Sequence, residues 1–439
     1  MSRRLAQTCA VLIAAAAATW ANAQEPSAGL VPLSDYTGEL FERSKLLGDF
    51  GGERTKLAEK GVQFNVGWVQ TAQSVVEGGR ETGTKYGGTF DYLLLLDFHR
   101  MGLVPGALLK VRAESRYGET VNPDSGSVLP VNTDGFFPLT SPFSDDIGIT
   151  VSDVTYFQYF SEKFGMFAGK FDGLDADANE FASGRGETQF MNLQLVFSGT
   201  FALLPYSTLG GGAVWMPEKN IKLQTAVFSL TDSSTTTGFD DCQGWVSASE
   251  ASVQYKLGSL PGGVNLGGIY IWDTDFFDFN GQFTFEPGQG LEAPRASDTW
   301  IAYFSGWQYL YAADPAGEVV DLTDGRPDLQ GIGLFWRTGL ADDDVNPGKW
   351  SLSGGLGGRG LVPGRAADSY GLGYYYNRVQ SGRFTNRVGL DDETQGFECF
   401  YSIAVTPSTA LTFDVQWIES ASTSVDDAIV LGARLKIDL

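Results

Sequence analysis

Residues 429–439 alternate strictly between apolar and small or polar side chains. The apolar face carries Ile429, Leu431, Ala433, Leu435, Ile437 and Leu439. The other face carries Gly432, Arg434, Lys436 and Asp438. Because successive side chains of a strand point to opposite faces, this pattern predicts a strand with one apolar and one polar side. The same alternation occurs in residues 411–417 and 90–98, so the period-two pattern is the feature that most constrains the fold.

Turn residues divide the chain after Gly61 into about sixteen such segments. They start near Val62, Gly87, Ala107, Val151, Phe164, Gly211, Ile221, Ser249, Gly263, Thr299, Gly331, Trp350, Ser369, Phe397, Ala410 and Asp427. The connectors alternate in length, which is typical of bacterial outer-membrane barrels with short periplasmic turns and long outer loops. One connector, 312–330, is long where a short one is expected, and a miscounted strand is one explanation for it.

No apolar run after residue 23 is long enough to form a membrane helix. In lipid every backbone polar group must be paired internally, so a β protein that spans the membrane has to close on itself. Sixteen strands enclose a water-filled lumen. We therefore predict an all-β fold, a transmembrane antiparallel β-barrel of about 16 strands, with apolar faces toward lipid. Aromatic residues near strand ends are candidates for its interfacial girdles, namely Tyr86, Tyr117, Trp215, Trp272, Trp300, Tyr311 and Trp417.

The first residues have the pattern of a secretory signal peptide. Arg3 and Arg4 precede a short apolar run, and Ala21-Asn22-Ala23 is a typical cleavage site. The predicted organisation is a signal peptide over 1–23, a partly helical N-terminal periplasmic segment over 24–60, and a barrel with inward-folded loops over 61–439. This organisation predicts export to the outer membrane of a Gram-negative-type bacterium.

The composition argues against several other functions. The formal charge is −23, and no basic run is present, so nucleic-acid binding is not expected. The only histidine, His99, lies in a predicted turn without a nucleophile motif. Cys242 and Cys399 lack metal-ligand spacing and are expected to be unpaired. We therefore predict a non-enzymatic protein without a cofactor or a bound metal.

The third predicted strand has the most informative polar face. Lys110, Arg112, Glu114 and Arg116 alternate with less polar residues. Such a row of both charge signs supplies donors and acceptors suited to sugar hydroxyls, and arginine offers a planar fork of donors. A generic hydrated pore wall is the alternative interpretation.

The segment from Asp172 to about Gln189 is too long for a hairpin and is strongly polar. It carries Asp172, Asp175, Asp177, Glu180, Arg185 and Glu187. We predict that it folds into the pore and narrows it, although an outer lid is an alternative. The spacing of Asp175, Asp177 and Asn179 matches the start of a calcium loop, but the later glycine and carboxylate are missing. A solvated acidic loop is therefore favoured there, as it is for Asp342-Asp343-Asp344.

Four stretches resemble the carbohydrate-selective porin family typified by OprB. They are LLGDFGGERTKLAEKGVQF at 46–64, GMFAGKFD at 165–172, LVPGRAADSYGLGYYYN at 361–377, and most of 397–439. The resemblance implies a sixteen-stranded porin for passive sugar diffusion, with a narrow point lined by arginine and acidic residues. Together with the polar segments, it gives the candidate pore-lining residues Arg112, Glu114, Arg116, Lys170, Asp172, Asp175, Asp177, Asn179, Glu180 and Arg185.

The expected function is diffusion of small sugars such as glucose, with sugars and outer-membrane lipid as partners. A homo-oligomer is compatible with the sequence. A general or cation-preferring porin is the first rival, because acidic pores attract cations. A secreted β-rich sugar-binding protein or hydrolase is a rival from another class.

Overall fold

The computed structural model describes residues 29–138, 146–176, 179–239, 242–286, 290–313, 327, 329–380, 389, 391–420 and 422–439. Sixteen strands of this part of the chain close into one antiparallel barrel. These strands are β1 (Val62–Gly79), β2 (Gly83–Asp97), β3 (Ala107–Gly118), β4 (Ile147–Ser161), β5 (Phe164–Asp172), β6 (Ser207–Glu218), β7 (Ile221–Ser229), β8 (Trp245–Leu257), β9 (Leu260–Phe277), β12 (Arg295–Ala312), β13 (Gly331–Ala341), β14 (Gly348–Arg359), β15 (Ser369–Val379), β16 (Glu393–Thr406), β17 (Thr409–Ile418) and β18 (Asp426–Asp438).

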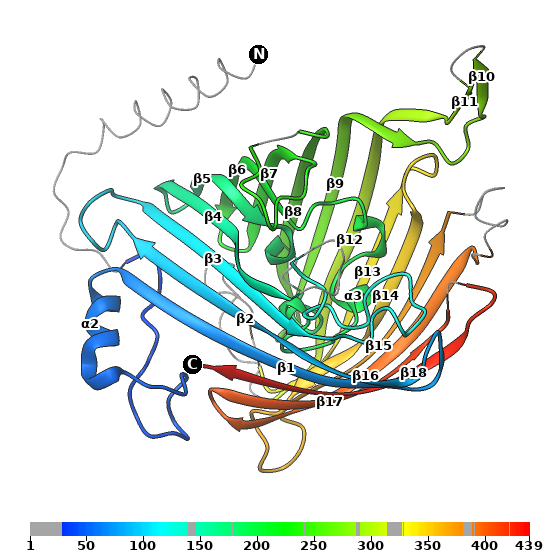
Figure 1. The fold of residues 1–439 in the computed structure, drawn as a ribbon. Coiled ribbons are helices and arrows are strands. Elements are labelled where there is room, and N and C mark those ends of the chain that lie inside the picture. Colours follow the sequence, from blue (N-terminus) through cyan, green and yellow to red (C-terminus); the bar gives the residue numbers. More distant parts are fainter. Residues whose placement is uncertain are drawn as a thin grey trace.

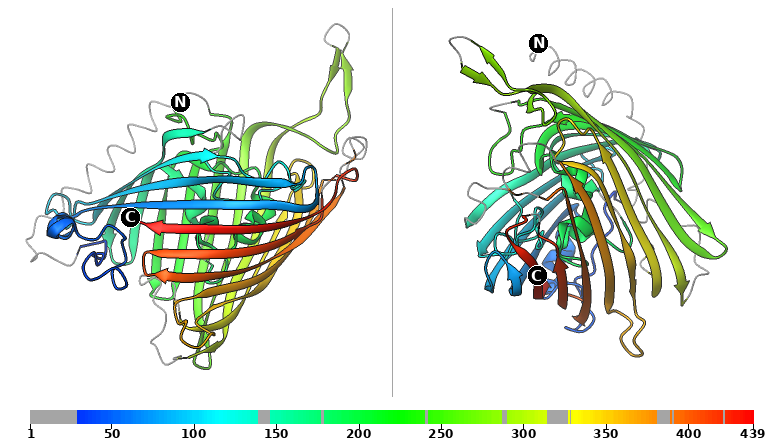
Figure 2. Two further views of the ribbon diagram at one scale, coloured as in Figure 1. Left: turned by 60° about the horizontal axis from the view of Figure 1, so that its bottom comes forward. Right: turned by 90° about the vertical axis from the view of Figure 1, so that its right-hand side faces the viewer.

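Each strand pairs with its neighbours in sequence, and the last strand closes on the first. The closing register pairs Trp68 of β1 with Ile437 of β18. Two short strands, β10 (Thr284–Glu286) and β11 (Gly290–Glu292), form a separate hairpin that projects beyond the barrel rim (Figures 1 and 2). The predicted antiparallel barrel of about 16 strands is confirmed. The strands on either side of the long connector 312–330 are both as counted, since β12 ends at Ala312 and β13 starts at Gly331, and most of the connector lies outside the described residues.

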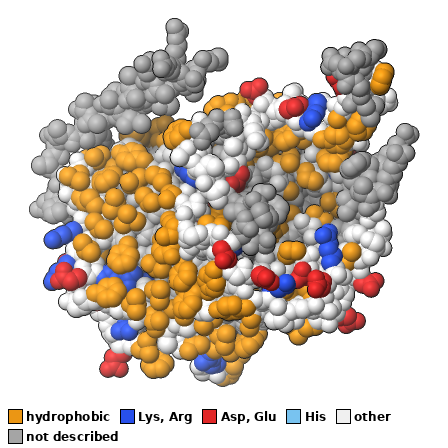
Figure 3. All heavy atoms as spheres, in the orientation of Figure 1, with side chains coloured by type: hydrophobic (Ala, Val, Ile, Leu, Met, Phe, Trp, Pro, Cys, Tyr) orange, Lys and Arg blue, Asp and Glu red, His pale blue; other side chains and the backbone are white. Residues whose placement is uncertain are grey.

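The alternation seen in the sequence separates a lipid side from a lumen side. In β18, Leu431 is 44% exposed on the outside, whereas Arg434 is completely buried inside. Of the predicted girdle residues, Tyr86, Trp215, Trp300 and Tyr311 are exposed. Figure 3 shows broad areas of hydrophobic side chains over the outer surface of the strands that face the viewer.

Two connecting segments turn inward instead of leaving the barrel. Residues 173–206, which join β5 to β6, include η2 (Gly173–Ala176), η3 (Gly184–Gly186), α3 (Leu193–Val196) and η4 (Gly199–Phe201). We call them the inward segment. Their apolar side chains pack on the inner wall of β12–β16 in a cluster of Phe181, Ala182, Phe190, Leu195, Val196, Trp307, Tyr309, Ala312, Phe335, Tyr375 and Phe400. Residues 119–138, after β3, pack through Val121 and Val131 against Val75, Ile418, Ala428 and Val430.

The chain before β1 covers the end of the barrel where the first and last strands meet. It contains η1 (Phe50–Gly52) and the short helix α2 (Glu53–Glu59), which lies beside the barrel in Figure 1. Arg54 donates to the carbonyls of Phe64 and Leu439 at 2.9 and 3.1 Å. The predicted helical segment is thus present. The predicted signal peptide, 1–23, lies outside the described residues.

Among the described residues, no helix combines the length and apolar character needed to cross a membrane. Cys242 and Cys399 are both free, as expected. His99 lies in the turn after β2, where its Nδ1 accepts from the backbone N–H of Gly106 at 3.0 Å.

Candidate functional site

The inward segment brings one arginine to the centre of the charged wall. Gly184, Arg185 and Gly186 have φ values of 78°, 59° and 80°. Three consecutive residues in this left-handed region reverse the chain sharply, and glycine on both sides makes that turn inexpensive. A Cβ at Gly186 would lie only 2.7 Å from Cβ of Thr133. Glycine is therefore favoured at 184 and 186 by the backbone conformation, and at 186 also because a side chain would clash with Thr133. The turn carries Arg185 toward β3 and β5.

Arg185 is surrounded by three carboxylates and a phenol. Its Nη2 donates to Glu114 Oε1 at 2.8 Å and to the hydroxyl of Tyr206 at 2.6 Å. Its Nη1 pairs with Asp172, and its Nε lies 3.4 Å from Glu187 Oε1. The Arg185 side chain is 13% exposed and that of Asp172 is fully buried. Buried charges are stable only when paired and hydrogen-bonded, and this arrangement meets that condition.

A second layer of ion pairs lies along β3. Arg112 donates through Nη1 to Asp172 Oδ2 at 3.2 Å, and its Nε lies 3.3 Å from Asp91 Oδ2 on β2. Two residues before Arg112, on the same face of β3, Lys110 lies 3.0 Å from Asp153 Oδ2 on β4. We call Asp91, Arg112, Glu114, Asp172, Arg185, Glu187 and Tyr206 the neck cluster. It joins strands β2, β3 and β5 to the inward segment.

Strand β18, which is separated from β3 only by β1 and β2, also holds this turn. Arg434 on β18 donates to the carbonyls of Gly186 and Gln189, at 2.5 and 2.8 Å. Its neighbour on the same face, Lys436, lies 2.9 Å from Glu187 Oε2. The turn that carries Arg185 is therefore fastened to both β3 and β18.

Further along, two more wall charges bind the backbone of the inward segment. The carboxylate of Glu398 on β16 accepts from the N–H groups of Met191 and Asn192 at 2.7 and 2.9 Å. Arg337 on β13 donates to the carbonyl of Leu195 at 2.6 Å and also to that of Ala182. These contacts satisfy backbone groups that the irregular segment cannot pair within itself.

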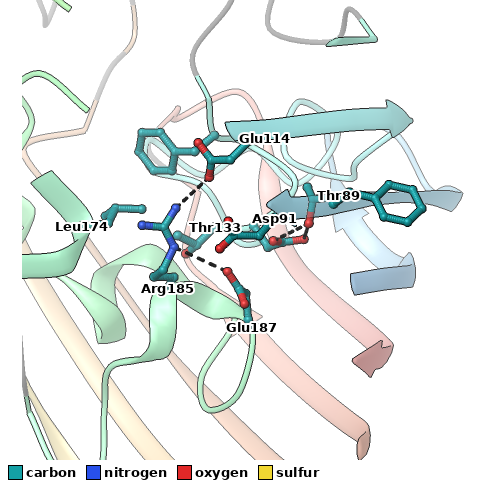
Figure 4. A pocket seen from close by; sticks show the side chains of 10 residues that line it. Thr89, Asp91, Glu114, Thr133, Leu174, Arg185 and Glu187 are labelled. Carbon is teal, nitrogen blue, oxygen red and sulfur yellow. Dashed lines mark hydrogen bonds and ion pairs between the residues drawn. The ribbon is translucent and has the colours of Figure 1, made fainter. Parts of the chain in front are cut away.

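A small hollow remains beside Arg185. Its volume is about 10 Å³, and its lining includes Thr89, Asp91, Glu114, Thr133, Asp134, Leu174, Arg185 and Glu187. Figure 4 shows Arg185 from the inward segment pointing at Glu114, with Glu187 beside it. A space of this size holds about one water molecule. The side chains around it present both donors and acceptors to whatever occupies it.

Burial and neighbouring charges shift the pKa values of two carboxyls, that of Asp134 in residues 119–138 and that of Glu187 in the inward segment. Burial raises the pKa of Asp134 to about 7, and nearby Glu187 adds to the effect. Burial also disfavours the charged form of Glu187, but Lys436 and Arg185 outweigh it and lower the pKa of Glu187. Burial raises the pKa of Tyr206 well above its usual value, so the phenol remains a donor to Glu114 Oε1 at 2.6 Å.

The structure brings together Arg112, Glu114, Asp172 and Arg185 of the predicted pore-lining residues. Arg116 lies further along β3, where it donates to the carbonyls of Phe136 and Pro138 at 2.7 and 3.2 Å.

Three of the remaining candidates make contacts with the barrel wall and its connecting segments. Lys170 donates to the carbonyls of Val151 and Thr236 at 2.6 and 2.8 Å. Asn179 and Glu180 are buried against β12, where Asn179 donates to Gly306 O at 2.9 Å and Glu180 accepts from Tyr309 at 2.6 Å. The reason is that the inward segment reaches the far wall directly after η2. The side chain of Asp175 and all of Asp177 lie outside the described part of the chain, and so does the calcium loop considered there.

Sequence reasoning missed several contributors to the site, namely Asp91, Tyr206, Arg337, Glu398 and Arg434. Arg434 and Glu398 both stand on the polar face of an alternating strand, so their inward direction was predictable. Their partners are backbone groups of a segment more than two hundred residues away in sequence, and no local pattern indicates such contacts. Among the described residues, Asp342, Asp343 and Asp344 form the one acidic group with metal-ligand spacing, at an exposed turn.

A closed sixteen-stranded antiparallel barrel whose lumen is crossed by an inward segment over a charged neck defines a porin architecture. The chain matches the family model of the carbohydrate-selective porin, OprB family, over residues 81–439. It therefore belongs to the OprB family of outer-membrane porins. The match includes the stretches at 165–172, 361–377 and 397–439, while the stretch at 46–64 precedes it.

Solved structures show the same fold. The high-pH structure of Pseudomonas putida OprB superposes with a TM-score of 0.76 at 19% identity, covering 92% of this chain and 100% of that chain. The low-pH structure of the same protein gives a TM-score of 0.57 at 17% identity, covering 91% and 99%. A comparison with curated protein sequences gave no significant match.

Proposed function

We propose that this chain is a diffusion channel that passes small neutral sugars, such as glucose, across the outer membrane. Membership of a carbohydrate-selective family supports the solute class. The observation that carries the proposal is the neck cluster, in which Arg112 and Arg185 are paired with Asp91, Glu114, Asp172 and Glu187. The proposal assigns the protein to the outer membrane and gives it no catalytic role.

Charge pairing gives such a neck a preference for uncharged polar solutes. A mobile ion entering the neck meets carboxylates that each already have a guanidinium at 2.8–3.4 Å, so it gains little attraction. A sugar, in contrast, exchanges hydroxyl–water hydrogen bonds for bonds to guanidinium donors and carboxylate acceptors. Each exchange is nearly neutral in free energy, on the order of 1 kcal/mol. That balance suits passage, because a solute must enter readily and also leave.

The residues of the proposed channel act by shaping the lumen and holding the inward segment in place. The inward segment narrows the lumen, and wall charges such as Glu398 and Arg434 hold it in place. The neck cluster then lies between the inward segment and β2–β5. The solute moves down its own gradient, and no group is required to change covalently.

A cation-preferring pore is the rival that the acidic composition favours. We expect the purified protein in a planar bilayer under a KCl gradient to give a zero-current potential close to zero, because the neck is charge-paired. Millimolar glucose added to one side should reduce the ion current by occupying the neck. A potential close to the potassium equilibrium value, with no effect of glucose, would favour the cation porin.

A further inference from the structure

A second group of polar and aromatic residues lies on the inner wall, away from the neck cluster. One cross-strand row runs through Val214, Gln224, Glu250, Gly267 and Tyr303 on β6, β7, β8, β9 and β12. The neighbouring row on the same face contains Gly212, Ala226 and Ala248. We call these eight residues, together with Phe167, the inner-wall patch. It lies on the side of the short connectors relative to the inward segment.

The direction of the patch follows from strand alternation. Leu266 and Phe304, each one residue from a member of the patch, are 62% and 38% exposed on the lipid side. Tyr303 instead contacts Phe201 of the inward segment, with ring centroids 5.0 Å apart. The members of the patch therefore face the lumen. A hollow of about 550 Å³ borders Trp215 and Leu266 on the lipid side of the same wall, and its lining also includes Gln224, Glu250 and Gly267.

Glu250 is the polar centre of the patch. Its Oε1 accepts from Gln224 Nε2 and from the hydroxyl of Ser252, both at 3.1 Å. Its Oε2 accepts from the hydroxyl of Tyr303 at 2.9 Å. These bonds orient the carboxylate and hold it beside Gln224 and Tyr303. Glu250 and Tyr303 are both half-buried, which leaves them accessible from the lumen.

Two aromatic rings lie flat on the wall on either side of this centre. A Cβ at Gly267 would meet Cζ of Tyr303 at 2.1 Å, so the tyrosine ring covers that glycine directly. A Cβ at Gly212 would likewise meet Cζ of Phe167 at 2.7 Å. The two glycines stand on β6 and β9, three strand spacings apart, or about 14 Å along the wall. Between them stand the small side chains of Ala226 and Ala248 beside Gln224 and Glu250.

We propose that the inner-wall patch is a second sugar-contact site, which binds a pyranose after it has passed the neck. The inference rests on the proposed function and adds a site to it. The apolar C–H face of a sugar ring packs on a flat aromatic ring, while its hydroxyls donate to a carboxylate and accept from an amide. The patch supplies these groups together: the rings of Tyr303 and Phe167, the carboxylate of Glu250 and the amide of Gln224. The side chains of the alanines and glycines between them are small, so a sugar ring can approach the backbone of the wall there.

The test is the residence time of glucose in single channels, measured from sugar-induced current fluctuations. Glu250→Gln keeps the size of the side chain and removes the charge that strengthens hydrogen bonds, so the residence time should fall about ten-fold. Ala248→Leu should shorten it as well, because the added bulk fills the wall between the rings. The current fluctuations induced by glycerol, which has no ring, should be the same in the wild type and in every variant.

Ser249→Ala is the matched control, since Ser249 is the neighbour of Glu250 on the lipid side and bonds only Thr225 across the strand, at 2.9 Å, in the outward-facing pair. It should leave glucose residence unchanged. Wild-type residence times in both Glu250→Gln and Ala248→Leu would overturn the inner-wall site while leaving the sugar channel intact. A wild-type channel that shows no glucose fluctuations at all would instead refute the proposed function.

Discussion

Removing the inward segment should raise single-channel conductance several-fold and abolish discrimination among sugars. Asp172 and Ser207, which flank the segment, are cross-strand partners in the β5–β6 ladder. A two-residue Asn-Gly turn can therefore replace residues 173–206 without disturbing the ladder. The barrel hydrogen bonds stay intact, and wall charges such as Glu398 gain water in place of the lost backbone groups. Conductance in a planar bilayer and migration of unheated samples in gels give the two readouts.

The matched control is removal of the β10–β11 hairpin, which stands clear of the barrel in Figure 2. That deletion should leave conductance unchanged. The position assigned to the inward segment would be wrong if the shortened barrel assembled normally and conducted like the wild type. Residues 173–206 would then lie outside the route that ions follow.

Arg185→Ala should make the channel strongly cation-selective. The substitution leaves Glu114, Asp172 and Glu187 without the guanidinium that lies within 3.4 Å of two of them and pairs with the third. One uncompensated charge a few ångströms from a passing ion is worth about 1–4 kcal/mol between watery and protein-like surroundings. The ratio of potassium to chloride permeability should therefore rise by about an order of magnitude. The zero-current potential under a KCl gradient measures that ratio.

Arg295→Ala changes the formal charge by the same amount at an exposed pair with Asp275, 3.7 Å apart. Because this pair is exposed to solvent, which screens its charges, we expect the wild-type potential. Equal potentials for the two variants would show that net charge, and not the pairing at Arg185, governs ion selectivity.

The sequence predicted the barrel well because a membrane strand repeats a rule that is entirely local. Six predicted strand starts, including Val62, Ala107 and Phe164, coincide with the structure, and the other ten fall within four residues. Alternation also predicted that Arg112 and Glu114 face inward. Each of these conclusions needs only the two-residue period and the requirement that backbone groups be paired in lipid.

The inward segment was harder, because irregular backbone is stabilised by distant partners. The sequence predicted that polar residues after Asp172 enter the lumen, but the segment continues to Tyr206 and becomes apolar at Phe190 and Leu195. Those side chains need the inner faces of β13–β16 to be buried, and only the closed barrel brings these faces near. For the same reason Asn179 and Glu180, polar in sequence, became buried anchors on β12.

Swelling of liposomes that contain the purified wild-type protein is the most direct test of sugar-selective diffusion. The three solutes are glucose, a glucose disaccharide, and a zwitterionic amino acid close to glucose in size. A neck of paired donors and acceptors predicts that glucose enters faster than the amino acid, which has to surrender strongly hydrated charges, and that the disaccharide enters more slowly. Equal rates for glucose and the amino acid would show that size alone governs passage and would contradict the sugar-selective neck.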